Sequence, residues 1–184
     1  MSSFSVPQDQ ASIESFETIY AVWLDFVWLL LRRLGVRAAD LEDATQEVFM
    51  VVHRRLDEYD RSRPFRPWLG GIAFRVALRE RRRPRHAREA PASSDDLSDL
   101  AGADGGPEQA LMDAQRRVRL LSALDDLSDE RRAVFVMHEL HEMPMPEVAA
   151  ALEVPVNTAY TRLRAARAEV KATLSRLRLT GGEL

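Results

Sequence analysis

Pro146-Glu-Val-Ala-Ala-Ala-Leu-Glu-Val-Pro-Val-Asn-Thr-Ala-Tyr-Thr-Arg-Leu163 is the stretch that decides the fold of this 184-residue chain. Pro146 suits the first turn of a short helix, Glu147 to Leu152, where a missing backbone N–H loses no hydrogen bond. Glu153, Val154 and Pro155 then form a tight turn, and a long basic helix begins at about Asn157. A short helix, a tight turn and a long second helix are typical of a helix-turn-helix.

The second helix of this stretch has a polar outer face. Alanines and valines at the inner positions allow the two helices to approach closely, which holds the second helix rigidly. Its outer side chains combine short polar groups with guanidiniums, which suit phosphates and base edges in a major groove. They are Asn157, Thr158, Tyr160, Thr161, Arg162, Arg164 and Arg167. The alternative is an ordinary amphipathic helical hairpin.

Helical periodicity continues upstream of this stretch. Pro107 opens a helix that directs Leu111, Val118, Leu121 and Leu124 inward, and Ser128 caps a further helix containing Val134, Met137 and Leu140. These helices and the helix-turn-helix predict a small C-terminal domain over residues 107–178.

The N-terminal part predicts a second bundle, of three helices, over residues 9–84. Apolar residues at three- and four-residue steps, among them Ile13, Tyr20 and Leu34, indicate a long first helix that Gly35 ends. Asp40 is expected to cap the second helix, and Pro67 to begin a third that stops at Pro84. The fold class is therefore all-α, with two small helical domains joined by a flexible linker.

Charge is distributed in blocks, although the formal net charge is only -3. Residues 61–88 hold ten arginines and one acid, and residues 89–115 hold seven acids and no lysine or arginine. Residues 85–106 lack aromatic residues and sustained periodicity, which predicts an acidic flexible linker. Solvated helix faces would explain any one block, whereas the alternation favours two nucleic-acid-facing surfaces.

A second candidate nucleic-acid surface lies in the first domain, where two aromatic residues stand among arginines. Such a pattern suits single strands, since rings stack on bases and guanidiniums meet phosphates. The candidates are Arg61, Arg63, Phe65, Arg66, Trp68, Arg75, Arg79 and Arg82. Trp68 could equally belong to the core, and the arginines near the helix end could be a solvated terminus.

Other classes of protein find little support. The apolar run Val22 to Leu31 is shorter than the roughly 18 residues of a membrane span, the N-terminus lacks a secretory signal, and cysteine is absent. His138 and His141 are three residues apart, whereas the metalloprotease motif needs histidines four apart. We expect a cytoplasmic protein with no catalytic residue, metal or cofactor and no membrane insertion.

Two stretches together resemble the extracytoplasmic-function (ECF) group of bacterial RNA polymerase sigma factors. Asp40-Leu-Glu-Asp-Ala-Thr-Gln-Glu-Val-Phe49, followed by Phe65-Arg-Pro-Trp-Leu69, resembles that family's region two. Leu127-Ser-Asp-Glu-Arg-Arg-Ala-Val-Phe135 and the helix-turn-helix resemble its region four. The resemblance implies a non-enzymatic factor that directs core polymerase to promoters and opens the DNA.

The resemblance also implies roles for the surfaces. Asp43, Gln46 and Glu47 would dock on the polymerase clamp, and the flap would be a further contact. The arginine-rich surface of the first domain would melt the proximal promoter element and capture an extruded base, and the last helix would read the distant element. The acidic linker would follow the RNA exit path, and an anti-sigma protein would be a regulatory partner.

Two positions depart from the family pattern. Glu153 stands where glycine is frequent, and would cost roughly 1 kcal/mol if the turn keeps a positive φ. Tyr160 stands where a basic residue is frequent, so the promoter preference is not transferred. Rival hypotheses are a free-standing helix-turn-helix repressor or activator and a metal-dependent hydrolase.

Overall fold

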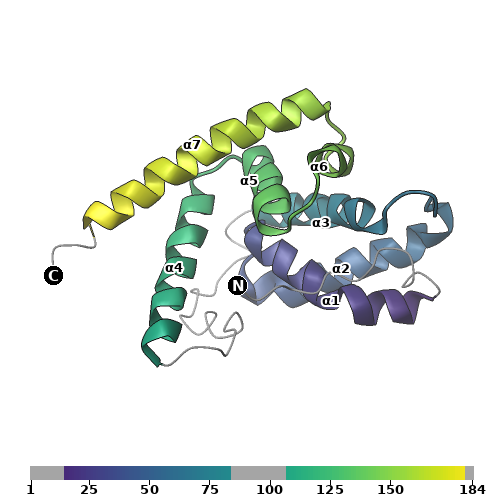
Figure 1. Ribbon diagram of the computed structural model, residues 1–184. Helices are drawn as coiled ribbons and strands as arrows, with labels where there is room; N and C mark the ends of the chain where they lie inside the picture. Colours follow the sequence, from purple (N-terminus) through teal and green to yellow (C-terminus); the bar gives the residue numbers. More distant parts are fainter. Residues whose placement is uncertain (1–14, 84–106, 181–184) are drawn as a thin grey trace.

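The computed structural model describes residues 15–83 and 107–180, and every regular element within them is helical (Figure 1). The first domain consists of α1 (Phe16–Arg33), α2 (Ala38–Arg55), the short 3-10 helix η1 (Leu56–Glu58) and α3 (Phe65–Arg82). The all-α prediction is confirmed. The predicted linker, residues 85–106, and the predicted domain start at residues 9–14 lie outside the described residues.

Local signals at both ends of α1 explain its length. The Ser15 hydroxyl accepts a hydrogen bond from the Thr18 backbone N–H at 3.3 Å and caps the start. At the other end Gly35 adopts φ 95°, its N–H bonds to the Arg32 carbonyl, and Val36 N–H bonds to the Leu31 carbonyl. This pair of bonds satisfies the last carbonyls of the helix, so the predicted stop at Gly35 is confirmed.

Two of the predicted helix starts in the first domain are wrong. Helix α2 begins at Ala38 after the extended Arg37, and Asp40 lies in the first turn, where its N–H donates to the Arg37 carbonyl at 2.9 Å. Helix α3 begins at Phe65 rather than Pro67, because Pro64 takes the N-cap position. Pro67 then occupies the first turn, where its missing N–H has no intrahelical partner to lose.

The second domain consists of α4 (Pro107–Asp125), α5 (Asp129–Phe135), the π-helical turn η4 (Val136–Leu140), α6 (Met145–Ala151) and α7 (Val156–Thr180). The predicted cap at Ser128 is confirmed, since its hydroxyl accepts from the Arg131 backbone N–H at 3.4 Å. One inward prediction is wrong, since Val118 is 40% exposed. In the first domain Tyr20, on the apolar face of α1, is also 42% exposed. Both lie on helix faces that no described helix covers completely.

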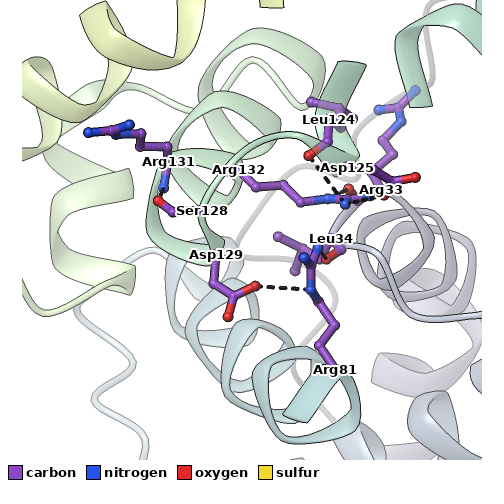
Figure 2. Close-up of polar contacts among 9 residues, drawn as sticks. All are labelled: Arg33, Leu34, Arg81, Leu124, Asp125, Ser128, Asp129, Arg131 and Arg132. Atoms are coloured by element: carbon purple, nitrogen blue, oxygen red, sulfur yellow. Dashed lines mark hydrogen bonds and ion pairs between the residues drawn. The ribbon is translucent and has the colours of Figure 1, made fainter. Parts of the chain in front are cut away.

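The two domains pack against each other. Helix α6 lies on α3, and the C-terminal end of α1 meets α5 (Figure 1). Buried apolar side chains of both domains form one continuous cluster. At its edge Arg132 of α5, only 2% exposed, donates from Nε to the Arg33 carbonyl at 2.7 Å and from Nη1 to Asp125 at 2.6 Å (Figure 2).

No helix in residues 15–83 or 107–180 is long and apolar enough to span a membrane.

Candidate nucleic-acid interface

Helices α6 and α7 form the helix-turn-helix. The turn between them contains a residue whose backbone is in the left-handed conformation. Glu153 adopts φ 55°, its N–H bonds to the Ala150 carbonyl at 3.2 Å, and Val154 N–H bonds to the Ala149 carbonyl at 3.0 Å. This is the hydrogen-bond pattern that Gly35 provides after α1, here made by a residue with a Cβ. The turn therefore keeps the positive φ at which a residue other than glycine is strained.

The inner faces of α6 and α7 fix the second helix in place. Val148, Ala149, Ala159, Leu163 and Ala166 are all at most 2% exposed. Because three of these side chains are single methyl groups, the two helix backbones can approach closely. This packing holds helix α7 in a fixed position, and its first turns follow directly after the turn that contains Glu153.

The predicted distal-element residues divide into three groups by exposure. Asn157, Tyr160, Thr161 and Arg164 share the outward face at three- and four-residue steps, and Tyr160 is 53% exposed. Thr158 and Arg162 are half-buried at the side of the helix. Arg167 is exposed but ion-paired, with Nε 2.9 Å from the Glu139 carboxylate. The outward face of α7 that we predict to enter a major groove is therefore centred on Asn157, Tyr160, Thr161 and Arg164.

The candidate proximal surface surrounds a pocket of about 500 Å³ next to the loop between η1 and α3. Trp68 is half-buried and lines this pocket. Its ring packs against Tyr59 at a centroid distance of 4.9 Å and against Phe65 at 5.4 Å. One side of the ring joins an aromatic cluster, as expected of a core residue, while Trp68 also lines the pocket, and its stacking on a base stays a prediction.

Two members of the predicted proximal set face inward. Phe65 is 0% exposed, packed between Trp23, Tyr59 and Trp68, so its ring has no face for a base and its expected contact is wrong. Arg66 lies over the Phe26 ring at 5.3 Å and donates to the His141 carbonyl in the second domain. In this structure Arg66 therefore joins the two domains.

The loop that leads into α3 is held by its own polar contacts. The Asp60 carboxylate accepts from the Ser62 hydroxyl at 2.6 Å and from the Ser62 backbone N–H at 3.0 Å, which holds the pKa of Asp60 below its usual range. Arg63 Nε lies 3.2 Å from the same carboxylate, and the Tyr59 hydroxyl donates to the Arg63 carbonyl. The backbone beside the pocket is thus preorganised.

The remaining proximal arginines are Arg61, in the loop before α3, and Arg75, Arg79 and Arg82 of α3. Arg61 and Arg82 are exposed. Arg75 Nη1 pairs with Glu153 at 2.9 Å across the two domains, and Arg79 pairs with Glu47 of α2. The guanidiniums of Arg75 and Arg79 therefore already have carboxylate partners that a phosphate would have to replace.

The predicted polymerase-docking residues lie on α2. Asp43 and Gln46 are exposed, whereas Glu47 is half-buried in its ion pair with Arg79. Beside them α1 and α2 enclose a groove of about 810 Å³, lined among others by Tyr20 and the 52% exposed Met50. Sequence reasoning missed this groove, although Met50 is an apolar residue outside the buried stripe of α2.

The two histidines of the rejected metal motif have separate surroundings. His138 Nδ1 lies 2.9 Å from the Met143 carbonyl oxygen. His141 is 7% exposed and packs edge-on against Phe26 of the first domain at 5.2 Å. Burial, reinforced by the nearby charges of Arg33 and Arg66, lowers the pKa of His141 to about 3. His141 is therefore a neutral component of the domain interface.

Comparison with known proteins identifies both domains. The family model described as Sigma-70 region 2 matches residues 19–87, and that described as Sigma-70, region 4 matches residues 117–170. The chain is 34% identical over 152 residues to the RNA polymerase sigma factor CnrH of Cupriavidus metallidurans, covering 78% of each chain. It is 31% identical over 174 residues to the ECF RNA polymerase sigma factor SigE of Mycolicibacterium smegmatis, covering 94% of this chain and 66% of that protein.

A solved structure agrees with these sequence matches. The structure of CnrH in complex with the cytosolic domain of CnrY aligns with a TM-score of 0.65 and 26% sequence identity. The alignment covers 88% of each chain, so the similarity extends over both helical domains.

Proposed function

The chain belongs to the extracytoplasmic-function group of the sigma-70 family, and we therefore propose which of its surfaces bind the polymerase and the promoter DNA. It directs RNA polymerase to promoters. Sigma factors are initiation factors, and we propose that all catalysis in the complex belongs to the polymerase.

Duplex reading is assigned to the outward face of α7. The observation that carries this proposal is that four exposed polar side chains face outward from a helix that α6 holds rigidly: Asn157, Tyr160, Thr161 and Arg164. The hydroxyl and amide groups can bond base edges, and Arg164 can meet a base or a phosphate. Arg162 and Arg167, at the sides of the helix, are assigned to the phosphate backbone, which fixes register but carries no sequence information.

Strand capture is assigned to the pocket beside Trp68. The pocket lies next to a preorganised loop and has an aromatic ring and guanidiniums around it, namely Trp68, Arg63 and Arg75. Arg61, Arg79 and Arg82 extend the basic surface along the strand path. An extruded base can stack while its phosphates meet arginines, which is how a protein holds a single strand.

Polymerase docking is assigned to α2 and the groove beside it. Asp43 and Gln46 offer exposed polar groups, and Tyr20 and Met50 offer exposed apolar area next to them. A polar rim around an apolar centre is the usual composition of a protein interface. CnrH is solved in complex with another protein, the cytosolic domain of CnrY. We propose that this chain also has a protein partner besides the polymerase, namely an anti-sigma protein.

The assignment is tested by transcription in vitro with core polymerase. Asp43→Lys combined with Gln46→Lys should abolish polymerase association, and Asp57→Lys, an exposed charge reversal just after α2, should leave it intact. Association that survives the α2 changes would remove the docking assignment. Arg164→Ala should weaken promoter use in the assembled complex without affecting association with core polymerase.

A further inference from the structure

The first two turns of α7 present two large apolar side chains to solvent. Val156 is 39% exposed and Tyr160 is 53% exposed. They are four residues apart, so both lie on the same face of the helix. Single exposed apolar side chains are common on protein surfaces and need no explanation. Two that adjoin on the face proposed to read DNA form an apolar contact surface within an otherwise polar interface.

A third apolar group on this face comes from Thr161. Its hydroxyl donates to the Asn157 carbonyl oxygen at 3.0 Å, one turn back in the same helix. The hydroxyl proton is therefore used within the helix, and the side chain offers a partner only an acceptor oxygen and a methyl group. Thr161 is exposed. The outward face of α7 is therefore more apolar than its residue types indicate.

These groups lie in the part of a helix-turn-helix that contacts base edges. The N-terminal residues of the second helix enter the major groove in such proteins, and the N-terminal end of α7 packs beside α6 (Figure 1). Asn157 and Arg164, assigned above to base edges and phosphates, share the same outward face. With α7 in the groove, Val156 and Tyr160 therefore face the edges of the base pairs.

The major groove offers one apolar group of matching size. Of the base edges that face this groove, only that of thymine carries a methyl group, and the others present hydrogen-bond donors and acceptors. The Cβ atoms of residues four apart on a helix are about 5 to 6 Å apart, and successive nucleotides of one strand are about 3.4 Å apart along the axis. Val156 and Tyr160 are therefore spaced to contact methyl groups one to two base steps apart.

We infer that Val156, Tyr160 and the methyl group of Thr161 form a thymine-reading surface, which contacts the C5-methyl groups of one or two thymines in the distal promoter element. The inference rests on the proposed function, because it takes the outward face of α7 to lie in the major groove of that element. Asn157 and Arg164 read hydrogen-bonding groups, and the apolar surface adds the methyl group. Tyr160 makes the largest contribution, because its side chain is larger and more exposed than that of Val156.

The test begins with a promoter that is obtained by selection. The purified complex of this chain with core polymerase is bound to duplex DNA that is randomised over the distal element, and the tightest binders are sequenced. We expect at least one position of the element to be fixed as an A·T pair. A selected element with no fixed A·T pair would overturn the inference.

Each fixed thymine is then replaced singly by deoxyuridine, which removes the methyl group and keeps every hydrogen-bonding group of the base. At one or two neighbouring positions the parent complex should bind the uracil duplex about fourfold more weakly, which is the effect of burying one group the size of a methylene. Equal affinity for the thymine and uracil duplexes at every position would show that no methyl group is read.

Variants of Tyr160 assign the methyl contact to this side chain. Tyr160→Ala should bind the thymine and uracil duplexes equally well at the position that the ring covers. Tyr160→Phe should keep the parent's ratio of affinities, because the ring and not the hydroxyl makes the contact. Thr161→Ser keeps the hydroxyl and removes only the methyl group, so it should lower the ratio in part. A ratio that stays near the parent's value in Tyr160→Ala would refute the inference.

Arg164→Ala, on the same face, serves as the matched control and separates this outcome from that of the proposed function. It should weaken binding to the thymine and uracil duplexes alike and keep the parent's ratio between them. A complex that depends on Arg164 but does not distinguish thymine from uracil would refute the thymine contact alone. Promoter binding that is unaffected by Arg164→Ala and by Asn157→Ala would instead remove the assignment of duplex reading to α7.

Discussion

Lowering the pH from 7.5 to 5.0 should weaken the folded state through His141. The imidazole is 7% exposed, and its pKa is lowered from the ordinary 6.5 to about 3 by burial and by the charges of Arg33 and Arg66. The folded chain therefore keeps His141 neutral over this whole range, whereas the unfolded chain takes up a proton below pH 6.5. Stability is fully present above pH 6.5 and is lost as the pH falls towards 3.

The size of the effect follows from the two pKa values. At pH 5.0 the unfolded pKa lies one and a half units above the solution pH, and each unit is worth about 1.4 kcal/mol, so the free energy of unfolding should fall by about 2 kcal/mol. Carboxylates with ordinary pKa values near 4 titrate mostly below this range. His141 is therefore expected to dominate the change.

The assay is urea unfolding at the two pH values for the parent chain, His141→Leu and His138→Gln. His141→Leu replaces the titrating group with a side chain of similar volume. The stability that this variant loses between pH 7.5 and pH 5.0 should therefore be only a few tenths of a kcal/mol. His138→Gln, three residues away on η4, should retain the parent's loss. Equal pH dependence in the parent and His141→Leu would show that the buried imidazole is not the cause.

Three further outcomes follow from the geometry. Glu153→Gly should relieve the left-handed strain at φ 55° and raise the stability of the helix-turn-helix by about 1 kcal/mol. Because this change also removes the ion-pair partner of Arg75, it should be measured in a chain that carries Arg75→Gln. If Glu153→Gly does not raise the thermal midpoint of that chain, the backbone at Glu153 is not strained. Ser128→Ala should cost about 1 kcal/mol in urea unfolding, because it removes the cap of α5, and an unchanged midpoint would mean that water replaces the cap. Arg164→Ala should weaken promoter binding by the polymerase complex by about 1 to 3 kcal/mol and relax specificity if the side chain meets a base, whereas a uniform loss across promoter sequences would assign it to phosphate.

The sequence was sufficient to predict the helices and turns that depend mainly on residues close together in the chain. Pro146, the alanines of α6 and the polar face of α7 predicted the helix-turn-helix, and Gly35 predicted the end of α1. The helix start predicted at Asp40 was wrong by three residues and that predicted at Pro67 by two, since a proline and an acid are both compatible with several positions in a first turn.

Long-range contacts were not accessible from the sequence pattern. Phe65 among arginines looked like a stacking residue, but its burial depends on Trp23 in α1, which no local pattern links to it. Glu47 and Arg79 are ion-paired across α2 and α3, so two residues assigned to different partners turned out to contact each other. The packing of α6 on α3 depends on Gly71, which the sequence shows only as one of two glycines inside a helix.

The ion pairs bear on how the proposed arginine surfaces of this acidic chain would bind DNA. Arg63, Arg75, Arg79 and Arg167 are each paired with a carboxylate, respectively Asp60, Glu153, Glu47 and Glu139. A phosphate must therefore replace a carboxylate, and the net gain is the difference between two similar ion pairs, which is small at an exposed surface.

One of these carboxylates lies on the face that we propose for polymerase docking. Glu47 belongs to this face of α2, so docking there would compete with its pairing to Arg79. Loss of that pair would expose the Arg79 guanidinium to the phosphate backbone, where cations displace condensed counterions from the DNA. The proposed docking on α2 would therefore place part of the gain in DNA affinity at assembly with the polymerase.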